Sequence, residues 1–151
     1  MLLAKNRKAL FNNEVLQTFM AGIVLYGYEV KAIKEGKVSF EGAYINIQSG
    51  EAFLTNLYIG PYSKQNQDLP ENQTKRPRKL LLNKAELNTI SREIAQKGHT
   101  AVPIALLLKN SLIKCEIAIV KGRKKFEKKV VAKERQIKKD LEVVKKELLR
   151  N

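Results

Sequence analysis

The chain has 151 residues, 44% of them apolar, and its 29 Lys and Arg residues outnumber its 15 Asp and Glu residues to give a net charge of +14. This composition supports one domain with an appendage and favours a polyanionic partner: RNA, DNA or an acidic membrane surface. The single cysteine excludes an internal disulfide, no apolar run reaches the ~20 residues of a membrane span, and the first eight residues lack the apolar segment of a secretory signal, so we expect a cytoplasmic protein.

The N-terminal third predicts one strand and one short helix. Residues 1–13 are polar and basic, with a turn at Asn12-Asn13, and the mostly apolar Glu14–Leu25 indicates a strand. Glu29–Glu35 has helical spacing of its apolar residues and is followed by Gly36, which suits a short helix with a glycine stop. A strand is the alternative for that segment.

The middle of the chain predicts a hairpin and then a long loop. Tyr44–Gln48 and Ala52–Ile59 alternate apolar and polar side chains on either side of residues 49–51, which is the pattern of a β-hairpin. Residues 63–79 are polar apart from Leu69 and include two prolines, so we expect a functional or disordered loop. The loop ends in a basic cluster of Lys75, Arg76, Arg78 and Lys79.

Asn83–Lys97 is the clearest predicted helix. Asn83 at its start and Glu86 three residues later have the spacing of a capping box, in which each side chain accepts a hydrogen bond from the other residue's backbone amide. Lys97 suits the last turn, and Gly98 follows as the stop.

A second hairpin is predicted from Thr100–Lys109 and Leu112–Val120, joined at Asn110-Ser111. The second arm alternates strictly, which indicates one buried face and one wet face. The buried face is expected to hold Ile113, Cys115, Ile117 and Ile119, and the wet face Lys114, Glu116 and Ala118. Pro103 cannot donate to a strand ladder, so it belongs near a strand start or a sheet edge.

These elements together predict a mainly β fold. Four or more antiparallel strands, with a helix between two hairpins, fit an oligonucleotide-binding (OB) antiparallel barrel with short helices. An open α+β sandwich is the alternative. We expect the barrel to occupy residues 1–120 and a basic C-terminal tail, disordered or helical, to occupy residues 121–151.

The tail, residues 121–151, has thirteen Lys or Arg and five Asp or Glu. Its apolar residues recur at helical spacing, at Val130, Ile137, Leu141, Val144 and Leu148. Nucleic acid would relieve the charge repulsion within this segment and allow it to order on binding. A helix that lies on the barrel or pairs with another copy of the chain is the alternative.

Enzyme chemistry finds little support in the sequence. His99 is the only histidine and no Asp lies near it in the chain, so a capping or loop role is expected. Cys115 falls on the apolar side of its strand, where a core role is expected. One Cys and one His do not supply the soft ligands of a metal site, and no cofactor is predicted.

Two groups of side chains suit RNA. Arg76, Arg78 and Lys79 can bridge phosphates or stack on bases, although a solvated charge run before a core strand fits equally well. Four tyrosines can stack on unpaired bases, with packing at a barrel rim as the more common role: Tyr26, Tyr28, Tyr58 and Tyr62.

Several short segments, in this order along the chain, resemble the family of SsrA-binding proteins, the small protein B of trans-translation. The resemblance covers roughly residues 5–140, and two basic runs in the same order make it specific. The matching segments are Asn6–Ala9, Ala21–Lys31, Gly36–Val38, Asn46–Tyr62, Arg76–Leu82, Lys97-Gly98, Val102-Pro103 and Lys121–Lys124.

This resemblance implies an OB barrel that binds transfer-messenger RNA at its tRNA-like elbow and delivers it to ribosomes stalled on messages without a stop codon. It implies that the basic tail enters the decoding centre and the vacant message channel and becomes helical there. It also implies a protein that catalyses nothing itself, needs no cofactor and binds no membrane. Alanyl-tRNA synthetase and elongation factor Tu are implied as indirect partners on the same complex.

On the positions that match, Leu81 and Lys114 correspond to family residues linked to RNA binding. Met20, before Ala21-Gly22, stands where the family usually has Glu, and a thioether does not accept a hydrogen bond as a carboxylate does. The resemblance and the basic cluster give the predicted RNA-binding set, which is Met20, Glu29, Lys31, Arg76, Arg78, Lys79, Leu81 and Lys114.

The resemblance also predicts ribosome-binding residues in the tail. Phe126 stands where the family often has Tyr or His, and Glu127 and Lys129 replace an Asp and an Arg. The last change loses the planar fork of a guanidinium. The predicted set is Lys121, Gly122, Arg123, Lys124, Phe126, Glu127, Lys128 and Lys129.

Three other functions fit the composition. A structural ribosomal component, with its tail threaded through rRNA, is the main alternative. An enzyme that modifies or cleaves RNA would depend on His99 or on carboxylates brought together by the fold. A membrane-surface binder would use the amphipathic tail, although lysines interrupt its apolar face.

Overall fold

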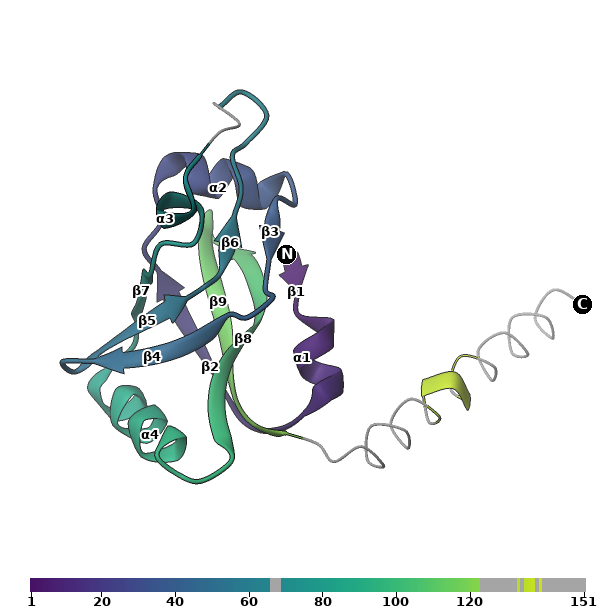
Figure 1. Ribbon diagram of the computed structural model, residues 1–151, viewed down its shortest axis with the longest axis vertical. Helices are drawn as coiled ribbons and strands as arrows, with labels where there is room; N and C mark the ends of the chain where they lie inside the picture. The colour runs from purple at the N-terminus through teal and green to yellow at the C-terminus, as the bar shows by residue number, and fades with distance from the viewer. Residues whose placement is uncertain (66–68, 123–132, 134, 138, 140–151) are drawn as a thin grey trace, which may run out of the picture.

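A single antiparallel sheet forms most of the computed structural model, which describes residues 1–65, 69–122, 133, 135–137 and 139 (Figure 1). The strand order is β1-β8-β9-β2-β7-β5-β4. The strands are β1 (Leu2–Lys5), β2 (Asn13–Ile23), β4 (Tyr44–Gln48), β5 (Glu51–Thr55), β7 (Arg78–Leu81), β8 (His99–Lys109) and β9 (Leu112–Gly122). A second, two-stranded sheet pairs β3 (Val38–Ser39) with β6 (Tyr58–Ile59).

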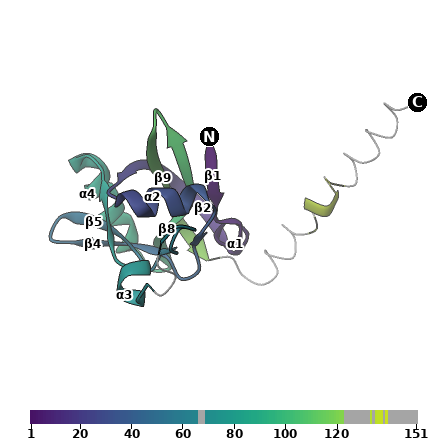
Figure 2. The same ribbon diagram turned by 90° about the horizontal axis from the view of Figure 1, so that it is seen from above.

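Four short helices accompany the sheet: α1 (Arg7–Asn12), α2 (Gly27–Lys34), α3 (Glu71–Thr74) and α4 (Lys84–Ile94). Figure 1 places α2 and α4 at opposite ends of the curled sheet, and Figure 2 shows the molecule from the α2 end. Ile33 of α2 and Ile90 of α4 are fully buried and join one core with inward-facing strand residues such as Leu54 and Ile117. The helices thus close the two ends of a core whose wall is the sheet.

The sheet curls so far that β4 approaches β8, but its end strands β1 and β4 are not paired with each other among the described residues. The barrel is therefore open. The predicted mainly β fold, with antiparallel strands and short helices, is confirmed. Among the described residues, no helix is long and apolar enough to span a membrane.

Both predicted hairpins are present. In the β8–β9 hairpin Lys109 pairs with Leu112, and the two turn residues Asn110 and Ser111 adopt left-handed φ values of 51° and 65°. The capping box of α4 is also present. The Glu86 amide donates to Asn83 Oδ1 at 2.8 Å, and the Asn83 amide donates to Glu86 Oε1 at 3.0 Å. This helix ends at Ile94, three residues earlier than predicted.

The first thirteen residues contain β1 and α1, which the sequence analysis did not predict. Asn6 explains the break between them, because its side chain accepts a hydrogen bond from the Ala9 amide at 3.2 Å and so caps α1. The same side chain donates to the Pro103 carbonyl at 2.8 Å, and the Asn6 amide donates to the Ile104 carbonyl at 2.8 Å. Asn6 thereby fixes α1 against the middle of β8.

Pro103 lies within β8 at a point where one side of the strand is unpaired, which agrees with the predicted position near a strand start or a sheet edge. A break in the β8–β9 register falls between Pro103 and Ala105, as expected for a β-bulge. On the other side of β8, the pairing with β1 stops at Ala105, and Asn6 takes over the adjacent hydrogen bonds. The proline is accommodated because no strand pairs with it on that side.

Ala118 corrects a second prediction. It was expected on the wet face of β9, yet it is fully buried. Ala118 packs with Ile104 and Val120, and Leu10 of α1 lies against them. Helix α1 therefore covers the outer face of the sheet at this end and leaves the positions of Lys114 and Glu116 partly exposed. The predicted burial of Ile113, Cys115, Ile117 and Ile119 is confirmed.

Three element boundaries also differ from the prediction. The expected strand Ala52–Ile59 is divided into β5 and β6, because Asn56 adopts a left-handed φ of 63°. The expected loop 63–79 contains α3 and the start of β7. Strand β9 continues to Gly122, since Lys121 and Gly122 pair with Glu14 and Asn13, so these two residues belong to the sheet and not to the tail.

The other residues of the predicted ribosome-binding set lie outside the described residues: Arg123, Lys124, Phe126, Glu127, Lys128 and Lys129. The described tail positions, 133, 135–137 and 139, are helical. Ile137, one of the residues in the predicted apolar stripe, is 50% exposed.

The burial of Cys115 gives a direct test of the core. Burial raises the pKa of the Cys115 thiol to about 12, so at pH 8 its reactive thiolate is about a thousandfold scarcer than for a free thiol of pKa 9.0. We expect iodoacetamide to leave the native protein unlabelled over the time in which it fully labels the protein in urea. Mass spectrometry counts the adducts, and complete labelling of the native protein would contradict this packing.

Candidate nucleic-acid interface

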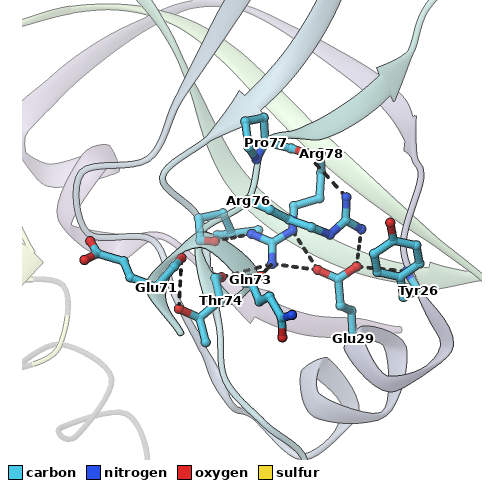
Figure 3. Close-up of polar contacts among 9 residues, drawn as sticks. Tyr26, Glu29, Glu71, Gln73, Thr74, Arg76, Pro77 and Arg78 are labelled. Atoms are coloured by element: carbon cyan, nitrogen blue, oxygen red, sulfur yellow. Dashed lines mark hydrogen bonds and ion pairs between the residues drawn. The ribbon is translucent and has the colours of Figure 1, made fainter. Parts of the chain in front are cut away.

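Glu29, in the first turn of α2, is a fully buried carboxylate that binds two arginines (Figure 3). Its Oε2 accepts a hydrogen bond from Arg78 Nε at 2.8 Å and lies 2.6 Å from Arg78 Nη2. Its Oε1 accepts from Arg76 Nη2 and from the Tyr26 amide, the latter at 2.8 Å. One side chain therefore caps α2 and joins it to the segment around the start of β7.

Arg78 is fully buried as well. Besides Glu29, its guanidinium donates to the carbonyl of Leu57 and to that of Thr74, the latter at 3.0 Å. Burial lowers the pKa of Arg78, and the charge of Glu29 opposes that shift. The Glu29–Arg78 pair links α2, α3, β7 and the residue before β6, which are far apart in the sequence. It therefore stabilises the packing of these segments at this end of the molecule.

Arg76 lies at the border of this network. Its side chain is 20% exposed, and its guanidinium carbon is 4.1 Å from the centroid of the Tyr26 ring. Tyr26 is also stacked with Tyr28, with 5.7 Å between the ring centroids. We refer to Tyr26, Tyr28 and Arg76 as the aromatic cluster.

Burial changes the interpretation of two predicted RNA contacts. Glu29 and Arg78 are 0% exposed, so an RNA molecule cannot touch their side chains in this fold. In this fold, Glu29 and Arg78 instead stabilise the packing of α2 against α3 and β7. Arg78 does not belong to a solvated charge run either, because it is fully buried against Glu29, 49 residues away in the chain. Lys79 is exposed and pairs with Glu51 at 3.1 Å.

Leu81, Gly22 and Lys114 lie side by side in one row across β7, β2 and β9. Gly22 of β2 is directly opposite Leu81 on one side and Lys114 on the other. One step along the same face of β2, Met20 is opposite Glu116. Leu81 is 54% exposed, Met20 is 47% exposed and Lys114 is partly exposed. We refer to this surface as the open face.

Glycine at position 22 allows two of these strands to approach closely. A Cβ added there would lie 3.2 Å from the Leu81 Cβ, which is tighter than ordinary contact. Next to the row, a surface hollow of about 470 Å³ is lined by Lys79, Leu81 and Glu51 among others. The open face thus combines apolar side chains, a lysine and a shallow hollow, which suits contact with bases and phosphates together.

The other predicted residues are not on this row. Lys31 is exposed on α2, with Nζ 5.1 Å from the centroid of the Tyr62 ring. Lys121 and Gly122 are at the far end of β9. His99 begins β8, with Nδ1 3.6 Å from Glu93. Within the described ranges, no three His, Cys, Asp or Glu residues gather as metal ligands.

Sequence reasoning missed two features of this surface. It weighed the tyrosines and Arg76 separately and did not place them in one cluster. It also did not follow the alternation of exposed and buried residues along β2 and past its last residue. Met20, Val24 and Tyr26 are all exposed, while Ala21 is buried. Positions spaced by two, with Gly22 among them, were the signal that could have found this face.

Comparison with known proteins agrees with the resemblance in the sequence. The family model described as SmpB protein matches residues 3–147. The chain belongs to this family. The SsrA-binding protein of Coprothermobacter proteolyticus is 42% identical over 141 residues, which cover 93% of each chain. That of Persephonella marina is 41% identical over 140 residues, covering 93% of this chain and 91% of the relative.

A solved structure also matches the fold. It was reported as "tmRNA-SmpB: a journey to the center of the bacterial ribosome". It superposes with a TM-score of 0.69 at 37% sequence identity and covers 83% of this chain and 87% of that chain. The open mainly β architecture is thus shared with a member of the SmpB family.

The buried network makes a prediction about stability. Replacing Glu29 by Gln should lower the free energy of unfolding by about 3–5 kcal/mol, because two guanidinium groups lose the buried charge that neutralises them. Urea unfolding followed by circular dichroism measures this loss.

Glu51→Gln is the matched control, since it removes a carboxylate from the exposed pair with Lys79 and should cost less than about 1 kcal/mol. Equal losses in the two variants would contradict the structural role assigned to Glu29.

Proposed function

We propose that this protein is an RNA-binding adaptor that binds transfer-messenger RNA and delivers it to stalled ribosomes for trans-translation. Membership of the SmpB family and the names of its relatives support this proposal. The observation that carries it is the open face, where Leu81 and Lys114, far apart in the chain, lie on either side of Gly22. An RNA surface can reach both at once.

In this proposal, different side chains of the open face contact different parts of the RNA. Lys114 and Lys79 neutralise phosphates, which supplies affinity without sequence preference. Leu81 and Met20 make apolar contact with ribose and base edges, and Glu116 beside Met20 is an acceptor for a ribose hydroxyl. Glu29 and Arg78 contribute indirectly, by holding β7 against α2.

The basic tail contacts the ribosome in this proposal. Residues 123–151 follow β9, and their positive charge suits rRNA in the decoding centre and the message channel. The adaptor acts in the cytoplasm and catalyses no reaction itself. Alanyl-tRNA synthetase and elongation factor Tu act on the same RNA.

The first test is selectivity at fixed salt. The full chain should bind transfer-messenger RNA more tightly than a tRNA or an unrelated RNA hairpin in a filter-binding or fluorescence-anisotropy titration. Equal affinity for all three would contradict the proposal. Selectivity is required because a net charge of +14 alone binds any RNA.

Lys114→Ala tests the open face. It should weaken binding several-fold and reduce the slope of log K against log salt by about one, since one phosphate contact is lost. Lys97→Ala, which removes the same charge from an exposed position after α4, is the control and should leave both quantities unchanged. The open face is the wrong surface if the two variants behave alike.

Truncation after Gly122 tests the tail. The shortened chain retains all of β9, so it should keep most of its affinity for transfer-messenger RNA. It should fail to support peptide tagging on stalled ribosomes in a reconstituted translation reaction. Loss of RNA binding and tagging in parallel would contradict the proposed role of the tail.

A further inference from the structure

The open face continues past the end of β2 to the aromatic cluster. The pairing of β2 with β7 ends at Ile23, and the Val24 amide still donates to the Lys79 carbonyl at 2.9 Å. Val24 is 47% exposed and Tyr26 is 56% exposed. Val24 and Tyr26 therefore continue, beyond the end of β2, the alternate spacing of Met20 and Gly22.

Tyr26 remains exposed although two neighbours touch its ring. Arg76 lies over the ring at 4.1 Å, and Tyr28, which is half-buried, is stacked with it at an angle of 28° between the ring planes. Tyr26 as a whole residue is nevertheless 56% exposed, so Arg76 and Tyr28 leave part of its side chain open to a further flat group.

A single buried group fixes the geometry of this cluster. Glu29 accepts a hydrogen bond from the Tyr26 amide and another from the Arg76 guanidinium. It thereby sets the backbone position of the ring and the position of the cation against it. The entropy of ordering a long arginine side chain is lost on folding and not on binding, which is the condition for a preorganised site.

The chemistry of the cluster selects one kind of ligand. An aromatic ring backed by a guanidinium suits the flat face of a nucleobase, and such stacking accepts every base. Bases inside an A-form duplex are already stacked on their neighbours, so the ligand must be a base outside a duplex. Exposed Lys31 and Lys34 on the adjoining α2 supply positive charge for its phosphates.

We propose that the aromatic cluster is a stacking platform for one unpaired base of the bound RNA, with Tyr26 as the contacting ring and Glu29 as a positioning residue. This inference rests on the proposed function, since it assigns one subsite of the RNA surface. The proposed contact lies beyond the row of Leu81, Gly22 and Lys114, and it is made to a base and not to a phosphate.

The chain contains no tryptophan, which gives the experiment a specific reporter. In the full-length protein, the fluorescence of Tyr26→Trp should be quenched when transfer-messenger RNA binds, because a base stacks on the indole. Tyr44→Trp, at a site 40% exposed on β4 at the far end of the sheet, should show much weaker quenching. Equal quenching at both sites, or none at position 26, would overturn the proposal.

Affinity supplies the second measurement. Tyr26→Ala should weaken binding by about 5- to 150-fold, the range measured for loss of one stacked base, with an unchanged salt slope. Arg76→Lys keeps the charge but loses the planar group and should also weaken binding. Circular dichroism and urea unfolding establish that each variant is folded.

The outcomes separate this inference from the function on which it rests. If the unmodified protein binds transfer-messenger RNA selectively and Tyr26→Ala binds equally well, the platform is wrong and the proposed function stands. If the unmodified protein shows no selectivity for that RNA, the proposed function is contradicted, and the stacking platform that rests on it is contradicted with it. A loss of affinity in Tyr26→Ala accompanied by a lower salt slope would assign Tyr26 to phosphate contact and would also overturn the stacking role.

Discussion

The structure depends on one buried carboxylate. Glu29 is fully enclosed, and it neutralises a fully buried guanidinium and a mostly buried one. Burying three charges is costly, and the cost is offset only when each charge has its partners in good geometry. Arg78 fulfils this condition by also donating to the carbonyls of Leu57, Gln73 and Thr74. The network therefore ties α2, α3 and β7 to one another.

This constraint has consequences at the surface. Because Arg78 and Leu80 point inward from β7, Lys79 and Leu81 must point outward. Leu81 then meets Gly22 and, across β2, Lys114. The same carboxylate that directs β7 also positions Tyr26 and Arg76. The inner face of the sheet carries stability, and the outer face around Gly22 remains exposed.

Much of the fold could be predicted from local patterns. Alternation and turn residues gave both hairpins, and the capping box gave α4, because these signals depend on neighbours within a few residues. The same alternation predicted that Lys114 lies on the solvent-facing side of β9. Asn6 was a local signal for helix α1 that the prediction overlooked, but the position of α1 could not be predicted, because Asn6 fixes it through a bond to β8 almost a hundred residues away. Ala118 was misplaced for the same reason, since α1 covers it.

The candidate site was predicted only in part. Leu81, Met20 and Lys114 were chosen by resemblance, and the fold brings them to one face. Arg78 and Glu29 were chosen for RNA contact, and the fold buries both. A run of basic residues contains no sign of which one will meet a carboxylate 49 positions away. Charge patterning predicts the class of partner, whereas the roles of single charges depend on long-range contacts.

The central claim is that RNA lies on the outer face of β7, β2 and β9 and leaves the buried network intact. The most direct measurement is an NMR titration of the isotope-labelled full chain with the tRNA-like part of transfer-messenger RNA. The account predicts that amide shifts concentrate at residues 20–26, 79–81 and 114–116 and that α4 is unaffected. Shifts concentrated on α4 or along β1, with residues 20–26 and 114–116 unchanged, would contradict it.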